Sequence, residues 1–154
     1  MRITSLVFFC LILAVAAATG IGQATSKSAR TTIGPDDLRA VKSSPAYAEV
    51  LVRKTELEAE LESLLVDHTD EFPKIREART ELEVIRSEMD RLLAVKAADA
   101  QKLSAALGRL ILAKIVHQAK LRQLRDQFSD DHPIVRRQRR TVEVYEAAIK
   151  EILG

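Results

Sequence analysis

The sequence is poor in the residues that enzymes and disulfide-bonded domains depend on. Its 154 residues include one cysteine (Cys10), five glycines and no tryptophan. A lone cysteine excludes an internal disulfide and a cluster of thiolate metal ligands. The glycines are scattered and form no phosphate-binding loop, and no serine lies in a nucleophile elbow. We therefore expect a protein that is not an enzyme and binds no cofactor.

An excess of one charge is also lacking. Lys and Arg number 24 and Asp and Glu number 22, which gives a formal net charge of +2. The overall charge therefore indicates no partner. The distribution along the chain is more informative, because residues 49–71 hold eight acids and two bases, whereas residues 120–143 hold seven bases and four acids.

Residues 1–24 are typical of a secretory signal peptide. Arg2 gives a positive start, an apolar run covers residues 6–18, and Gly22 and Ala24 are small residues before a cleavage point. The apolar run is shorter than the ~20 residues that a membrane-spanning helix needs. We therefore expect a secreted protein of the bacterial periplasm, held at a membrane only if this segment stays uncleaved.

An internal repeat with an offset of 60 residues is the strongest pattern in the chain. Residues 61–93 recur as residues 121–153, and the identical pairs are Leu61/Leu121, Leu64/Leu124, Asp70/Asp130, Pro73/Pro133, Arg76/Arg136, Arg79/Arg139, Glu83/Glu143, Val84/Val144 and Leu93/Leu153. Each copy has leucines at helical spacing, an acidic turn and a second helical run, which predicts an α-helical hairpin. The turn motifs are Asp70, Phe72 and Pro73 in the first copy and Asp130, His132 and Pro133 in the second.

A seven-residue apolar period runs through both copies and predicts helices that pack along a seam. Lys54 and Lys114 interrupt the seam at equivalent positions. All four prolines stand where a helix can begin, since proline lacks the N–H that is unpaired there. These signals predict helices at about 45–68, from Pro73 to about residue 128, and at about 134–153.

We expect an all-α fold of two tandem antiparallel, coiled-coil-like hairpins, at about 45–97 and 105–154, that share one long central helix. Residues 25–44 are predicted to be a flexible linker with a short helix from Pro35. The central helix is expected to be continuous because its middle is rich in alanine. The alternative is a fold-back near 94–108 into a compact four-helix monomer. The extended form leaves six apolar residues uncovered, which predicts a homo-oligomer: Leu51, Leu65, Leu93, Ile111, Leu112 and Ile115.

Four arginines in the second copy form the candidate binding site. Arg136, Arg137, Arg139 and Arg140 occupy the first turns of a predicted helix, where the helix dipole disfavours cations. Positive charge at an unfavourable place indicates an anionic partner, such as an acidic glycan, anionic lipid or the acidic arm of another subunit. A nucleic-acid partner is not expected, because no aromatic stacking platform accompanies the arginines.

Histidines beside aspartates raise the possibility of a metal site in each turn. His68 lies near Asp67 and Asp70, and His132 follows two further aspartates. However, no two histidines are spaced to share one helical face. Acids just before a helix are also explained by the positive end of its dipole, without an ion. We therefore expect no metal site.

Residues 121–150 resemble the periplasmic coiled-coil hairpins of polysaccharide chain-length determinants and exopolysaccharide-export co-polymerases. The matching residues are Leu121, Leu124, Phe128, His132, Pro133 and Val135. The first turn departs from the pattern, with His68 for the aromatic residue and Phe72 for the histidine. Those co-polymerases have transmembrane segments at both ends, and many have a globular α/β portion, which these 154 residues do not contain. The resemblance implies a periplasmic helical hairpin and does not imply control of polymer length.

Together these features predict a non-enzymatic, secreted coiled-coil protein that acts as a structural or interaction module. It would work by self-association or by docking to an envelope protein, a polysaccharide or part of an export machinery. The alternative is a periplasmic helical chaperone or a stress- or metal-sensing protein, although the Leu-Thr-x-x-Gln type repeat of such proteins is absent.

Overall fold

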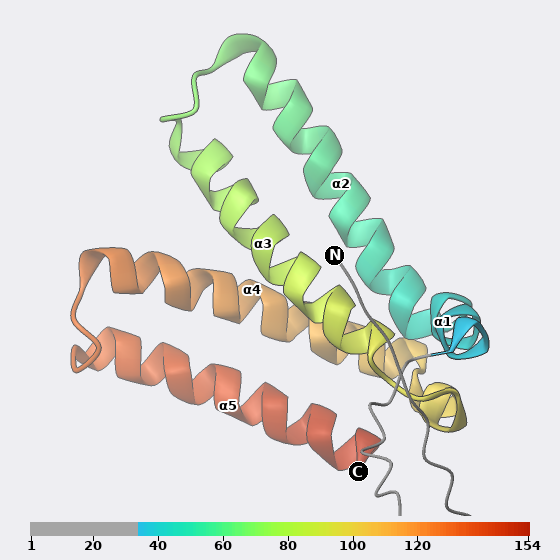
Figure 1. The fold of residues 1–154 in the computed structure, drawn as a ribbon. Coiled ribbons are helices and arrows are strands. Elements are labelled where there is room, and N and C mark those ends of the chain that lie inside the picture. Colours follow the sequence, from blue (N-terminus) through green and yellow to red (C-terminus); the bar gives the residue numbers. More distant parts are fainter. Residues whose placement is uncertain (1–33) are drawn as a thin grey trace, which may run out of the picture. The chain divides into compact units, whose positions relative to one another are not determined.

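The computed structural model describes residues 34–154, and within this range every regular element is helical (Figure 1). The elements are α1 (Pro35–Lys42), α2 (Pro45–Asp67), α3 (Pro73–Leu93), the 3₁₀ helix η1 (Ala97–Lys102), α4 (Ala105–Gln127) and α5 (Pro133–Leu153). The predicted all-α fold is confirmed. The predicted signal peptide and residues 25–33 of the predicted linker lie outside the described residues. Among the helices of residues 34–154, none combines the length and hydrophobicity needed to cross a membrane.

The four long helices form two hairpins whose boundaries repeat at the offset of 60 residues. The first hairpin consists of α2 and α3, and the second consists of α4 and α5. Ser44 caps α2 by accepting a hydrogen bond from the backbone N–H of Tyr47, and Ser104 caps α4 by accepting one from Leu107, each at 3.3 Å. The tandem hairpins are therefore confirmed, and the repeat extends to the helix caps.

The predicted continuous central helix is wrong. α3 ends at Leu93, η1 follows, and α4 begins at Ala105. The expected helix from Pro73 to about residue 128 is therefore two helices joined by a connection at 94–104. α4 packs against both α2 and α3, so the chain folds back near 94–108, as in the alternative that the sequence left open.

Burial and capping explain why the alanine-rich connection is not helical throughout. Leu103 is buried in the core, and its carbonyl accepts a hydrogen bond from the N–H of Ala46 at 3.1 Å. That bond satisfies one of the amides left open at the start of α2. Ser104 then starts a new helix by capping α4. These tertiary interactions outweigh the small helical preference of each alanine.

α1 packs against η1 and α3. Val41 of α1 is fully buried in the core, and Asp37 Oδ1 accepts a hydrogen bond from the N–H of Ala97 at 2.8 Å. The pKa of Asp37 is lowered by this bond and by a second one from the N–H of Gly34. The short helix predicted from Pro35 therefore fastens the connection between the hairpins.

α4 lies at the centre of the arrangement because it contacts α2, α3 and α5, whereas α5 contacts α4 and η1. Gly108 permits the closest approach, since a Cβ at this position would lie 3.0 Å from both Ala46 Cα and Glu49 Cβ. One core cluster joins the first hairpin to α4, and a separate small cluster lies inside the second hairpin. Among residues 34–154, no helix therefore neighbours one side of α5.

The two lysines in the seam have different surroundings. Lys114 is buried and its Nζ pairs with Glu88 Oε2 of α3 at 2.6 Å. Lys54 remains partly exposed and pairs with Glu58 on its own helix, also at 2.6 Å. Lys114 therefore takes part in the contact between the hairpins, whereas Lys54 at the equivalent position forms an ion pair at the surface.

Candidate functional site

The two turns, residues 68–72 and 128–132, are built in the same way although their aromatic residues are exchanged. His68 stacks on Phe72 with ring centroids 4.0 Å apart, and Phe128 stacks on His132 at 4.5 Å. The sequence indicated a difference between the turns here. The structure shows the same histidine–phenylalanine pair in reversed order, so these rings close the turn in both copies.

An aspartate–arginine pair also recurs in both turns. Asp70 accepts a hydrogen bond from Arg79 in the first hairpin, and Asp130 accepts one from Arg139 at 3.0 Å in the second. Both pairs belong to the identical positions of the repeat, and each ties the turn to the helix that follows it. The turn-motif residues Asp70, Phe72, Pro73, Asp130, His132 and Pro133 therefore have a structural role in the hairpins.

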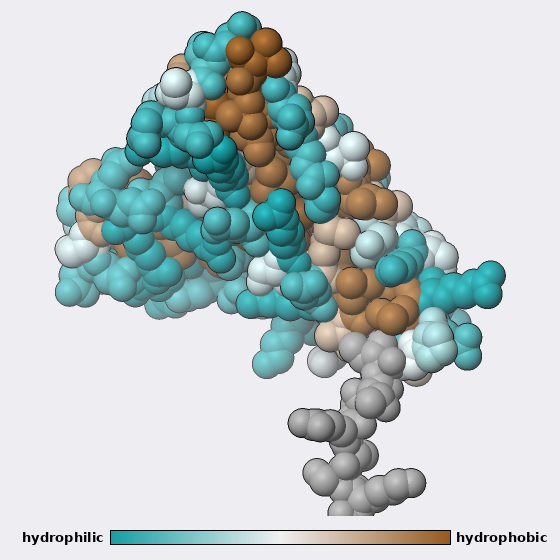
Figure 2. Space-filling view, turned by 45° about the horizontal axis from the view of Figure 1, so that its top comes forward, coloured by the Kyte–Doolittle hydropathy of each residue, from teal (hydrophilic) through white to brown (hydrophobic). Residues whose placement is uncertain are grey.

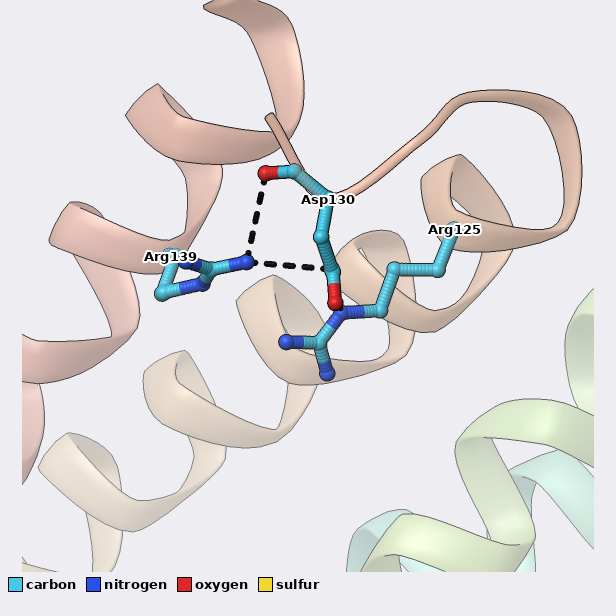
Figure 3. Close-up of polar contacts among 3 residues, drawn as sticks. All are labelled: Arg125, Asp130 and Arg139. Carbon is cyan, nitrogen blue, oxygen red and sulfur yellow. Dashed lines mark hydrogen bonds and ion pairs between the residues drawn. The ribbon is translucent and has the colours of Figure 1, made fainter. Parts of the chain in front are cut away.

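Asp130 has a second arginine partner that the first turn lacks. Arg125 Nε donates to Asp130 Oδ1 at 2.8 Å, and Arg139 reaches both the carboxylate and the backbone carbonyl of Asp130 (Figure 3). The hydrogen bond and charge of Arg125 lower the pKa of Asp130, and Arg139 adds to the effect. Position 65, equivalent to 125, is a leucine.

The ion pairs of Asp130 predict a measurable titration. The carboxyl group should titrate below its ordinary pKa of 3.8, so its contribution to stability is present above that pH and is lost as the pH falls through the lowered value. In an Arg125→Ala variant the pKa should rise towards 3.8, and in Arg139→Ala it should rise less. Carboxyl-carbon NMR titration measures this. Arg137→Ala is the control, and an unchanged pKa in Arg125→Ala would contradict the geometry.

The four candidate arginines are not equivalent. Arg139 is 38% exposed, but its guanidinium is already engaged by Asp130 of the turn. Arg140 pairs with Glu143 at 2.7 Å, yet its side chain is 84% exposed. Arg136 and Arg137 are exposed on the same helix. The candidate binding surface is therefore Arg136, Arg137 and Arg140, which we call the basic face.

The basic face borders a shallow, open hollow of about 910 Å³ whose lining residues all belong to α5. A hollow of about 450 Å³ occupies the equivalent place beside α3, where Pro73, Arg76, Glu77 and Thr80 are opposed by residues of α4. The hollow beside the basic face therefore has a wall on one side only, and we call it the half-groove. Such a surface can bind an anionic partner.

Within residues 34–154, the histidines and the buried charged side chains have partners in the fold. No three His, Cys, Asp or Glu residues in this range are placed to hold a metal ion. His117 stacks on Tyr145 at 5.2 Å, and its carbonyl accepts a hydrogen bond from Gln138 at 2.8 Å. The buried Glu88 and Lys114 border a hollow of about 310 Å³, but they neutralise each other.

One feature was missed from the sequence, and a second was predicted only in part. One is the Glu88–Lys114 pair, for which the only signal was a lysine at a seam position. The other is a set of exposed apolar residues on α2, namely Leu51, Val52, Leu65 and Val66. Figure 2 shows an apolar band that reaches the surface along the first hairpin. The sequence predicts that Leu51 and Leu65 must be covered, whereas nothing in its pattern singles out Val52 and Val66.

Comparison with known proteins gives no family for this chain: it matches no protein-family model, no curated protein and no solved structure.

Proposed function

We propose that this protein is a non-enzymatic helical interaction module of the cell envelope that binds an acidic partner through its basic face. The observation that supports this most directly is the open half-groove beside Arg136, Arg137 and Arg140. Guanidinium groups form paired hydrogen bonds with carboxylates and phosphates, so this surface suits an acidic glycan or an acidic protein surface.

The position of the basic face also supports a role in binding. Cations in the first turns of α5 lie at the positive end of the helix dipole, which is unfavourable for folding. The equivalent positions in α3 are Arg76, Glu77 and Thr80, which together carry no net charge. A surface that is electrostatically costly and differs from its internal copy is a good candidate for recognition.

The envelope location rests on the composition of residues 1–24 and on the resemblance of residues 121–150 to periplasmic hairpins. A secreted protein without a disulfide relies on helix packing for stability, and the buried seams of the two hairpins are consistent with that.

Charge reversal tests the proposed binding surface. The triple variant Arg136→Glu, Arg137→Glu and Arg140→Glu should lose most of its retention on immobilised alginate, an acidic polysaccharide, because the phosphate- or carboxylate-binding groups are removed. Retention of the unchanged protein should fall with added salt, since exposed charges are screened. Elution conductivity measures both effects, and circular dichroism checks that helicity is kept.

The matched control changes the same number of charges on the first hairpin and the connection. Lys74, Arg86 and Lys96 are exposed, and their reversal to glutamate produces the same change in net charge. This control should keep clearly more retention than the α5 triple variant. Equal losses in the two variants would show that only overall charge matters and would refute the proposed binding surface.

A further inference from the structure

The contact between the two hairpins has two sides, and the repeat allows each side to be located in both copies. One side is a stripe on α4 that faces the first hairpin. It includes Gly108, which approaches Ala46 and Glu49, together with Ile111 and Ile115, which are buried in the cluster shared with the first hairpin. With Leu112 and Ala119, these residues follow the spacing of one helical face.

The other side of the contact is a row on α3. Glu88 bonds Lys114 of α4, and Glu83 pairs with Arg122 of α4 at 3.3 Å. Val84, one turn before Glu88 on the same face, is fully buried. α3 therefore turns this row towards α4, and α2 contributes Ala46 and Glu49 beside it.

Each of these two surfaces occurs a second time, at an offset of 60 residues, and there it is open to solvent. Val144, the equivalent of Val84, is 67% exposed, whereas Val84 is 0% exposed. Leu51, the equivalent of Ile111, is 42% exposed, whereas Ile111 is 3% exposed. The α2 stripe consists of Ala48, Leu51, Val52, Thr55 and Ala59, all exposed. The α5 row consists of the exposed Glu143 and Val144 and the partly buried Ala148, and the exposed Ile152 continues it one turn further on.

The α2 stripe lacks the charge expected of a solvated helix face. Its five residues are apolar or small, although acids occupy much of the rest of α2. The α5 row is apolar apart from Glu143, the equivalent of Glu83, which pairs with Arg140. On one molecule the first hairpin thus exposes one half of a hairpin contact, and the second hairpin exposes the other half. Within residues 34–154, the one contact between hairpins already joins the α4 stripe to the α3 row. The α2 stripe and the α5 row therefore both stay uncovered in a single molecule.

We propose that a second copy of this chain docks head to tail, with its α2 stripe against the α5 row, and so repeats between molecules the contact that joins the two hairpins within one. This deepens the proposed function and rests on it, because it names the acidic partner of the basic face. The partner is the acidic α2 of the next copy.

The charges of the two surfaces are complementary around the basic face, whereas the Glu83–Arg122 ion pair is not repeated, because its equivalents are Glu143 and Glu62. In the hollow beside α3, the opposing α4 residues include Lys120, Gln123 and Gln127. Their equivalents on α2 are Glu60, Ser63 and Asp67. A docked second copy would therefore bring Glu60 and Asp67 to the half-groove of the basic face and complete it. Such complementarity between surfaces favours the correct register and speeds encounter.

The buried pair Glu88–Lys114 at the centre of the internal contact has no counterpart between molecules, and its loss leaves no charge unpaired there. Ala148 stands where Glu88 does, so the second copy brings no acid to that position. Lys54, the equivalent of Lys114, is already paired with Glu58. The docked interface would thus be more apolar at its centre, with the ion pairs placed around the basic face.

This contact is heterologous, since it joins two different surfaces. Every docked copy leaves one free α2 stripe and one free α5 row, so association continues until a ring closes or a filament grows. Stacking of equivalent hairpins is also how repeat proteins extend a continuous core. Two-fold dimers, in which a surface meets itself, are not expected.

Two single substitutions test the head-to-tail contact in solution. Val52→Glu places a charge on the α2 stripe, and Val144→Glu places one on the α5 row. The unchanged protein should form species larger than a dimer in a sedimentation-velocity concentration series. Each variant alone should sediment as a monomer with normal helicity. An equal mixture should form dimers and nothing larger, because only one intact surface of each kind remains.

Disulfide trapping determines which surfaces meet. A Cβ at Gly108 would lie 3.0 Å from Glu49 Cβ, and the equivalent intermolecular pair is Ala48 and Arg109. Ala48 has the Cβ that Gly108 lacks, so the docked helices must lie slightly farther apart than α2 and α4 do. In a Cys10→Ser background, Ala48→Cys mixed with Arg109→Cys should still give mixed disulfide dimers, since that shift brings the two Cβ atoms towards the usual disulfide separation of about 3.8 Å. Ala48→Cys mixed with Arg86→Cys is the control and should give few.

The outcomes separate this inference from the proposed function. A monomer at every concentration, or Ala48→Cys linked mainly to itself, would refute head-to-tail docking. Val144→Glu keeps all the arginines of the basic face, so it should still bind alginate while self-association is lost. The triple arginine variant tests whether the basic face takes part in the contact. If Val144→Glu loses self-association but the triple arginine variant keeps it, the basic face does not take part.

Discussion

Replacing Glu88 with leucine should destabilise the protein by about 3–5 kcal/mol, because it leaves the ammonium of Lys114 buried without a partner. Both side chains of this pair are only 5% exposed. The reverse change, Lys114→Met, should cost less, since Glu88 keeps its hydrogen bond of 2.8 Å from Arg91 at the surface. Urea unfolding followed by circular dichroism measures both losses.

The double variant Glu88→Leu with Lys114→Met separates the two explanations of that loss. If the cost comes from an uncompensated buried charge, replacing both partners with apolar residues should restore most of the stability. Lys54→Met is the internal control, and because its ion pair is partly exposed, it should cost no more than about 1 kcal/mol. A loss of similar size in Lys54→Met and Glu88→Leu would contradict the observed difference in burial.

Shortening Ile115 to alanine should destabilise the protein by about 2–5 kcal/mol, because it opens a cavity in the contact between the hairpins. Ile115 is 0% exposed, whereas its equivalent Thr55 is exposed on α2. Thr55→Ala should therefore change stability by less than about 0.5 kcal/mol when measured at low protein concentration.

The comparison of Ile115→Ala with Thr55→Ala also tests the fold-back. If the chain were extended through one continuous helix, position 115 would lie off the hairpin seam and would resemble position 55. Equal effects of the two substitutions would therefore argue for the extended form. A large effect at Ile115 alone would support packing of α4 on the first hairpin.

The sequence was sufficient to predict the helices of the hairpins because their signals are local. Proline at the first helical position placed the starts of α2 and α3 correctly, and the seven-residue period identified buried positions such as Leu57 and Leu82. The offset of 60 residues then predicted the helices of the second hairpin from those of the first.

The connection at 94–104 was mispredicted because its structure is decided by tertiary contacts. Alanine favours a helix in isolation, but burial of Leu103 and the bond between Asp37 and Ala97 fix a turn. Asp37 and Ala97 are 60 residues apart, so no local pattern signals their contact.

The binding surface was predicted only in part for a similar reason. A cluster of arginines is visible in the sequence, but the capture of Arg139 by Asp130 depends on how the turn closes. The difference between Lys54 and Lys114 depends on which hairpin face meets a neighbour. A repeat shows which positions are equivalent, and only the packing shows which of them are buried.

The placement of the connection has a consequence for the order of folding. Within each hairpin the two helices are separated by five residues, so their contacts are short-range, whereas contacts such as Asp37 with Ala97 span 60 residues. Short-range contacts form fastest, since they close small loops. Each hairpin should therefore assemble early and the two should dock late. In stopped-flow measurements, Ile115→Ala should then mainly accelerate unfolding and leave the folding rate nearly unchanged.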